Sequence, residues 1–167
     1  FWTYSCVNCL RTLPYLKDWN QKYSSYGLVI VGVHTPEFEF EKDIENVKRA
    51  VAELGVVWPV VLDSNHQVWQ AYANAWWPRK LLIDANGLVV HDHIGEGGYG
   101  ETEQMIQKEL QRLSVEEIEF PPPTEDEGRG GICYPTTPEY YLGSARGLLG
   151  NPLINRAKVT LAPSAKV

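Results

Sequence analysis

Apolar residues in the first 113 positions follow two patterns, a helical spacing of three or four and short continuous runs. A spacing of three predicts a helix over about 10–23 that begins at or just after Cys6. The apolar residues of that spacing are Leu10, Leu13, Leu16 and Trp19. An interior proline removes one backbone hydrogen bond, so we expect a kink at Pro14. A second amphipathic helix is predicted at about 44–54.

The continuous apolar runs predict strands. The run at 28–33 reads LVIVGV and predicts a central strand that is buried on both faces. The run at 56–63 reads VVWPVVLD and predicts another strand, in which Pro59 is tolerated only at the start, at an edge or at a bulge. Strands separated by helices are typical of a mostly parallel sheet with helices on both faces.

The second half of the patterned region predicts a short helix, a hairpin and a last helix. The short helix is expected at about 68–72 and the last one at about 106–113. Two apolar runs, 81–84 and 88–94, flank an Asn-Gly pair at 86–87, which is the strongest short hairpin signal. We therefore expect an antiparallel pair at one side of the sheet.

The pattern ends near residue 116. Residues 117–132 combine acidic residues, three consecutive prolines and several glycines, a composition typical of an extended linker. Residues 133–167 contain tyrosines and some apolar residues without a sustained period. We therefore predict a domain at 1–116, a linker at 117–132 and, at 133–167, the start of a truncated second module.

Composition narrows the possible functions. The formal net charge is -6, and the 15 basic residues are dispersed among 21 acidic ones, which argues against a general nucleic-acid binder. No apolar run approaches the roughly 18 residues of a membrane-spanning helix. The chain opens at Phe1, where a strand already ends, so we expect that N-terminal strands of a longer protein are missing.

Two cysteines three residues apart, Cys6 and Cys9, carry the candidate chemistry. This spacing fits a zinc site, a structural disulfide or a redox-active dithiol. A zinc site needs four ligands, and it could use both cysteines with His91 and His93, which alternate along a predicted strand. The ordinary interpretation of the two histidines is a solvated strand face. A structural bridge is disfavoured because so short a loop constrains the unfolded chain little.

A redox role agrees best with the position of the pair. A thiol at a helix N-terminus lies near unsatisfied N–H groups, which stabilise the thiolate and lower its pKa. Cys6 is predicted at that position, and Cys9 lies one turn inside the helix. We therefore expect Cys6 to attack and Cys9 to resolve, with no metal and no cofactor beyond the dithiol.

Several motifs resemble one family. The segment FWTYSCVNC, followed by a helix with Pro14, resembles the active-site segment of the thioredoxin superfamily. The helix and strand at 41–62 resemble the insertion of the TlpA and ResA branch. Closer still, 1–113 is similar to the C-terminal thioredoxin-like region of DipZ-type proteins. The motifs of this similarity are CVNCLRTLPYL, VGVHTPEFEFEKD, AYANAWWPRKLLIDANG and GEGGYGETE, and the later TTPEYYLGSARG resembles the start of the carbohydrate-binding-module-like domain that follows in that family.

The resemblance implies an α/β thioredoxin-like fold with a TlpA-type insertion, a central mixed sheet flanked by helices, and a C-terminal extension. It implies a thiol-disulfide oxidoreductase with Cys6 and Cys9 as catalytic residues. A cis peptide bond before Pro78 would let Trp77 and Pro78 form a substrate platform, whereas Trp76 has core or rim packing as its ordinary interpretation.

The resemblance also implies partners and a location. Expected partners are protein disulfides or dithiols and a membrane or thioredoxin-type electron donor or acceptor, with no nucleic acid. The expected location is extracytoplasmic, with a membrane tether supplied by parts outside this chain. The alternative is a non-catalytic module of the same fold that presents its tail to a carbohydrate or protein.

Three features depart from the family pattern or stand apart from it. Thr12 stands where ResA-like proteins carry a glutamate, so the group that accepts the Cys9 proton is open. The nearby carboxylates are Glu37, Glu39 and Glu41, for which we expect a solvated acidic loop. Cys133 lies beyond the predicted linker, and we expect it outside the active site.

Overall fold

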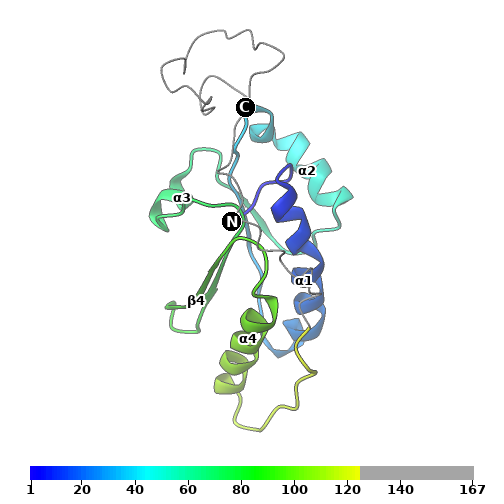
Figure 1. Cartoon of the computed structure of the whole chain (residues 1–167), viewed down its shortest axis with the longest axis vertical. Coiled ribbons are helices and arrows are strands. Elements are labelled where there is room, and N and C mark those ends of the chain that lie inside the picture. Colours follow the sequence, from blue (N-terminus) through cyan, green and yellow to red (C-terminus); the bar gives the residue numbers. More distant parts are fainter. Residues whose placement is uncertain (125–167) are drawn as a thin grey trace, which may run out of the picture. The chain divides into compact units, whose positions relative to one another are not determined.

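The computed structural model describes residues 1–124 (Figure 1). Helices and strands alternate in the expected way, and the chain has a thioredoxin-like α/β fold. The elements are α1 (Val7–Tyr23), η1 (Ser24–Tyr26), β1 (Gly32–His34), η2 (Glu39–Lys42), α2 (Ile44–Glu53), β2 (Val60–Leu62), α3 (Gln67–Ala71), β3 (Arg79–Ile83), β4 (Val89–Ile94) and α4 (Tyr99–Leu113).

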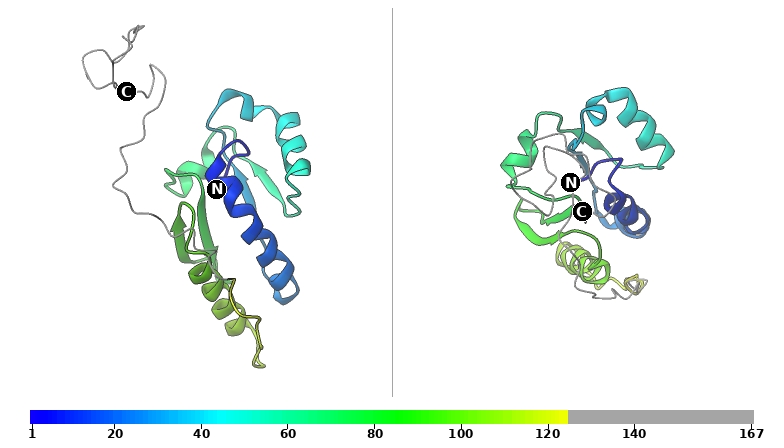
Figure 2. Two further views of the ribbon diagram at one scale, coloured as in Figure 1. Left: turned by 45° about the vertical axis from the view of Figure 1, so that its right-hand side comes forward. Right: turned by 45° about the horizontal axis from the view of Figure 1, so that its top comes forward.

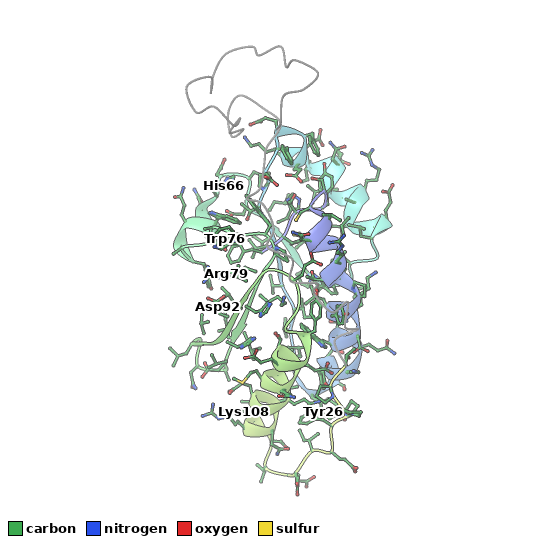
Figure 3. The ribbon with its side chains drawn as sticks, in the orientation of Figure 1. Tyr26, His66, Trp76, Arg79, Asp92 and Lys108 are labelled. Atoms are coloured by element: carbon green, nitrogen blue, oxygen red, sulfur yellow. The ribbon has the colours of Figure 1, made fainter. Side chains whose placement is uncertain are left out.

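Two pairs of strands form the sheet structure. β1 runs parallel to β2, with Gly32 opposite Val60. β3 runs antiparallel to β4, as the Asn-Gly turn predicted, and its register shifts between Leu82 and Ile83. The guanidinium of Arg79 contacts both carboxylate oxygens of its β4 neighbour Asp92 at 2.7 and 2.8 Å, and Figure 3 shows the two side chains beside each other.

The first two residues connect the strand pairs. The Trp2 N–H donates to the Val33 carbonyl at 2.9 Å, and the Trp2 carbonyl accepts from Thr35 at 3.0 Å. On the other side, Phe1 donates to the Arg79 carbonyl at 2.8 Å and accepts from the Arg79 N–H at 3.2 Å. The order across the molecule is therefore β2, β1, residues 1–2, β3 and β4.

The apolar run at 28–33 differs from its prediction. Only its last two residues are in β1, and Val29 and Val31 are 75% and 51% exposed. An apolar cavity of about 630 Å³ is lined both by this run and by residues of β3. The prediction of a strand buried on both faces is wrong here, because 28–31 pair with no other strand in the described part of the chain.

The helices begin where their capping groups allow. α1 starts directly after Cys6 and continues without a break through Pro14 to Tyr23. Asp43 caps α2, since its carboxylate accepts from the N–H groups of Glu45 and Asn46. Figures 1 and 2 place α3 on the other side of the strands from α1 and α2. Over residues 1–124, no helix has the length and apolar character that a bilayer span requires.

Two apolar clusters form the core, and α1 contributes to both. The first lies around the dithiol and consists of Trp2, Cys9, Leu13, Val56 and Trp58. The second lies between α1 and α4 and consists of Trp19, Tyr23, Tyr99, Ile106 and Leu110. The spacing of three predicted Leu13 and Trp19 of these clusters, and the other two predicted positions, Leu10 and Leu16, are partly buried against them.

A buried carboxylate, Glu103 of α4, joins the second cluster to the end of the described chain. It accepts hydrogen bonds from Trp19 Nε1 at 3.0 Å, Lys22 Nζ at 3.1 Å and the Tyr23 hydroxyl at 2.5 Å. The Thr124 N–H also donates to it at 2.7 Å. Four donors around one buried carboxylate offset the cost of its burial.

The first residues of the predicted linker contact the helices. The Phe120 ring lies edge-on to Tyr23 and Tyr26, at centroid distances of 5.9 and 5.5 Å. The remainder of the predicted linker, Cys133 and the predicted module at 133–167 lie outside the described residues. The division of the chain into domain, linker and module therefore stays a prediction.

Candidate active site

The two cysteines lie together at the start of α1. Cys6 is the N-cap residue, with extended backbone angles, and its Sγ accepts a hydrogen bond from the Cys9 N–H at 3.4 Å. Both residues are free thiols. Cys6 is partly exposed, whereas Cys9 is fully buried in the first apolar cluster. One sulfur is therefore accessible to a partner and the other is shielded.

The environment of Cys6 favours its thiolate. A hydrogen bond from the Cys9 thiol is the main cause that lowers the pKa of Cys6 from 9.0 to about 6. Backbone N–H groups of Cys9 and Asn8 act in the same direction, as expected at a helix N-terminus. Partial burial and the charge of Glu37 act in the opposite direction. The lowered pKa favours the thiolate form of Cys6 at neutral pH.

Cys9 has the opposite character. Its hydrogen bond to Cys6 and its burial raise the pKa of the Cys9 thiol far above the ordinary range, although the backbone of Thr3 acts to lower it. The two sulfurs together therefore hold one proton, and that proton is on Cys9. This arrangement suits an exposed nucleophile beside a protected second thiol.

In the described contacts, the Thr12 hydroxyl bonds to the helix backbone and to neither sulfur. It donates a 2.6 Å hydrogen bond to the Cys9 carbonyl and is buried inside α1. Thr12 occupies the position where ResA-like proteins carry a glutamate. At this position the chain therefore has a hydroxyl that bonds to the helix backbone in place of a carboxylate.

The three glutamates near the site differ strongly in environment. Glu39 is exposed and pairs with Lys42 at 2.5 Å. Glu37 lies close enough to Cys6 to oppose its ionisation. Glu41, however, is only 1% exposed, so the expectation of a solvated acidic loop is wrong for this residue. Hydrogen-bond donors from two separate segments offset the cost of its burial, and sequence spacing does not reveal them.

Glu41 accepts four hydrogen bonds. Its Oε1 accepts from the hydroxyls of Thr3 and Ser5, each at 2.5 Å. Its Oε2 accepts from the N–H groups of Glu37 at 2.6 Å and Phe38 at 2.9 Å. Burial acts to raise the pKa of Glu41, but these hydrogen bonds outweigh it and hold the pKa below its ordinary value. Glu41 is therefore a buried carboxylate that joins two loops.

A buried histidine completes this network and was missed by the sequence analysis. His34 Nε2 lies 3.2 Å from the Thr3 hydroxyl, and the Tyr4 ring stacks on the imidazole at 5.6 Å. Burial lowers the pKa of His34, although the charge of Glu41 acts against that shift. The sequence analysis included His34 only as part of the motif VGVHTPEFEFEKD and gave it no role.

One of the two predicted platform residues, Trp77, packs against the dithiol cluster. The Trp77–Pro78 peptide bond is cis. The Trp77 indole donates to the Thr35 carbonyl at 3.0 Å and packs against the apolar cluster that contains Cys9. Trp76 is 56% exposed and points outward in Figure 3, so core packing does not describe it.

The histidine pair of β4 contacts other groups. His91 Nε2 lies 3.0 Å from the Thr102 hydroxyl, and His93 Nε2 lies 3.1 Å from the Glu96 carbonyl. Within residues 1–124, no group of three or more His, Cys, Asp or Glu side chains is arranged to hold a metal ion. The structure therefore does not bring these histidines together with the cysteines as metal ligands.

Comparison with known proteins agrees with this geometry. DipZ of Mycobacterium tuberculosis is 46% identical over 110 residues, which cover 66% of this chain and 16% of DipZ. The thiol-disulfide oxidoreductase YkuV of Bacillus subtilis is 29% identical over 116 residues, which cover 70% of this chain and 75% of YkuV.

A solved structure shows the same fold. The thiol:disulfide interchange protein DsbE from Chlorobium tepidum superposes with a TM-score of 0.60 at 25% identity, covering 66% of this chain and 76% of its own. The chain thus spans a small part of DipZ and most of the shorter relatives.

The Redoxin family model matches residues 1–109, the part of the chain that holds the dithiol, the buried network and the cis proline. The chain therefore belongs to the Redoxin family, and this part of it is a thioredoxin-like oxidoreductase domain.

Proposed function

We propose that the chain exchanges disulfides with protein substrates through Cys6 and Cys9. The observation that carries this proposal is the pairing of a partly exposed N-cap thiolate, Cys6, with a buried protonated thiol, Cys9. Nucleophilic attack on a disulfide needs a thiolate with access to the partner. The described pair supplies both properties without another cofactor.

In the reducing direction, the Cys6 thiolate attacks one sulfur of a substrate disulfide. The substrate S–S bond breaks, a bond forms between Cys6 Sγ and that sulfur, and the other substrate sulfur leaves as a thiolate. The product is a mixed disulfide. Cys9 remains buried during this step, because its sulfur lies in the apolar cluster.

The second step follows from the loss of charge on Cys6. The largest cause that raises the pKa of Cys9 is its hydrogen bond to Cys6, and a mixed disulfide removes that thiolate. The Cys9 proton can then leave, and the Cys9 thiolate attacks Cys6 Sγ. The Cys6–Cys9 disulfide forms and the substrate leaves as a dithiol after taking up protons, so two electrons have passed to it.

Trp77 and Pro78 are proposed as the platform for the substrate strand. Trp77 packs on the cluster that holds the dithiol, and its indole is fixed by the Thr35 carbonyl. A proline has no N–H to offer, so the backbone before it is left to pair with an extended substrate segment.

Partners and location are part of the proposal. We expect protein disulfides or dithiols as substrates and a membrane or thioredoxin-type protein as electron donor or acceptor. The similarity to DipZ supports an extracytoplasmic location, and we expect a membrane tether from parts outside this chain.

The experiment compares Cys9→Ala with Cys6→Ala after incubation with a disulfide-bonded protein at pH 8. Cys9→Ala retains attack but lacks the resolving thiol, so mixed disulfides should accumulate as reducible higher-mass species. Cys6→Ala lacks the accessible thiolate and should form none. Non-reducing mass analysis measures both.

The wild-type protein and a fold check by circular dichroism serve as controls. A non-catalytic module would form no adduct in either variant, and a structural disulfide would give no difference between them. Either result with folded proteins would overturn the proposal.

A further inference from the structure

We propose that Glu41 is a positioning residue, which holds the segment before Cys6 in the geometry that places the Cys6 sulfur at the N-terminus of α1. This inference rests on the proposed function of the dithiol, but it concerns a residue outside it. Glu41 touches neither sulfur in the described contacts, and it acts through Thr3 and Ser5.

The contacts of Glu41 span two separate segments. Oε1 binds the Thr3 and Ser5 hydroxyls of the segment before α1, and Oε2 binds the N–H groups of Glu37 and Phe38 before η2. Each of the two segments is thus fixed at two points by one carboxylate. Two contacts restrict the orientation of a short segment more than a single contact does.

The adjacent aromatic residues support the same junction from the outside. The Tyr4 hydroxyl donates to the Phe40 carbonyl at 3.2 Å, and the Tyr4 ring lies edge-on to Phe40 at 6.2 Å. The Tyr4–Phe40 hydrogen bond is exposed, whereas those of Glu41 are buried or partly buried. A buried carboxylate with satisfied hydrogen bonds contributes more to a fixed geometry than an exposed contact.

The fixed segment leads directly to the nucleophile. The Thr3 carbonyl accepts a hydrogen bond from the Cys6 N–H at 3.3 Å, so the segment from Thr3 to Cys6 forms a closed turn. The Cys6 Sγ in turn accepts from the Cys9 N–H at 3.4 Å. Moving the turn would therefore move the sulfur away from the donors that stabilise its thiolate.

The chain offers a matched control in Glu103. It is also a buried carboxylate with four hydrogen-bond donors, but it joins α1 and α4 at the second apolar cluster. Loss of Glu103 should reduce stability as loss of Glu41 does. It should leave the turn before Cys6 unchanged.

The experiment measures the ionisation of Cys6 in the reduced Glu41→Ala and Glu103→Ala proteins, each carrying Cys133→Ser. Thiolate absorbance near 240 nm is followed against pH. In Glu41→Ala we expect the midpoint of Cys6 to rise by about one pH unit, a tenfold change in its ionisation equilibrium. In Glu103→Ala the midpoint should stay at the value of the parent protein.

A Glu41→Gln variant separates geometry from charge. Its amide oxygen can accept from the two backbone N–H groups, and its NH₂ group can donate to the Thr3 and Ser5 hydroxyls, which accept as well as donate. A positioning role predicts a midpoint close to that of the parent protein. Loss of the Glu41 charge alone would lower the Cys6 midpoint, because a nearby carboxylate disfavours a thiolate, so a fall in both variants would assign the effect to charge and overturn the positioning role.

Other outcomes also decide the question. An unchanged midpoint in folded Glu41→Ala, or an equal rise in Glu103→Ala, would refute the inference. If Glu41→Ala does not fold, Thr3→Val tests the same link by removing the hydroxyl that binds Glu41, and the same rise is expected. Failure of the proposed function can be told apart from failure of the positioning role. If the proposed function fails, Cys9→Ala traps no adduct, and this result does not depend on the midpoint of Cys6.

Discussion

The ionisation of Cys6 should depend on the chemical nature of residue 9. In the reduced protein, the largest cause that lowers the pKa of Cys6 is the hydrogen bond from the Cys9 thiol. Cys9→Ala removes this donor, whereas Cys9→Ser keeps a hydroxyl at the same place. We therefore expect the pKa of Cys6 to be higher in the alanine variant than in the serine variant and the parent protein.

The size of the effect follows from the hydrogen bond. A hydrogen bond to a charged group contributes about 1.5–3 kcal/mol, and one pKa unit corresponds to about 1.4 kcal/mol. The Cys6 sulfur is partly exposed to water, which weakens the bond, so the low end of that range applies. The pKa of Cys6 should rise by about one unit in Cys9→Ala, while the backbone N–H groups keep it below the ordinary value.

The midpoint of the pH profile is a better measure than the rate at one pH. At pH 7, lowering a thiol pKa from 9.0 to about 6 raises the thiolate fraction from about 1% to about 90%. The same shift lowers the intrinsic nucleophilicity about 15- to 30-fold, so the net gain in rate is only about three- to sixfold. A rate alone would therefore not reveal the altered ionisation.

The assay records the rate of reaction with a small aromatic disulfide between pH 4 and pH 10, in proteins that carry Cys133→Ser. The folded-state pKa of Cys6 is lowered, so thiolate reactivity is present above about pH 6 and is lost as the pH falls through that value. An ordinary midpoint in the parent protein would refute the proposed geometry. So would identical midpoints in the alanine and serine variants, because the Cys9 donor would then have no effect.

Two further outcomes are expected. Hydrogen bonds from Tyr23, Thr124, Lys22 and Trp19 outweigh the effect of burial and lower the pKa of Glu103, so its stabilising effect is present above its unfolded pKa of about 4.3 and is lost as pH falls through the folded value. Glu103→Gln should therefore lower the free energy of unfolding by about 1–3 kcal/mol at pH 7 and have a smaller effect at pH 3, as measured by urea unfolding. Cys133→Ser should leave disulfide exchange unchanged, and loss of activity in the folded variant would place Cys133 in the site.

The sequence alone determined the elements that depend on local periodicity. The apolar spacing located α1, and the Asn-Gly pair located the β3–β4 hairpin. The dithiol at the start of α1 was also predictable, because the N-cap position depends only on residues next to it in the chain. These features need no knowledge of distant contacts, so local chemistry was sufficient to find them.

The apolar run at 28–33 shows the limit of that approach. Its composition predicted a strand buried on both faces, but only Gly32 and Val33 of the run pair with a neighbouring strand. Strand formation needs a partner, and the partner of a parallel strand is distant in sequence. Burial of this run was therefore decided by the tertiary structure.

Glu41 shows the same limit at the site. As a sequence feature it was one of several acids in a polar loop, for which exposure is the ordinary expectation. The fold brings it to Thr3 and Ser5, which lie 38 and 36 positions away in the chain, and so makes it a buried carboxylate. Only tertiary structure decides such a contact, since no local pattern specifies which donors a buried carboxylate will meet.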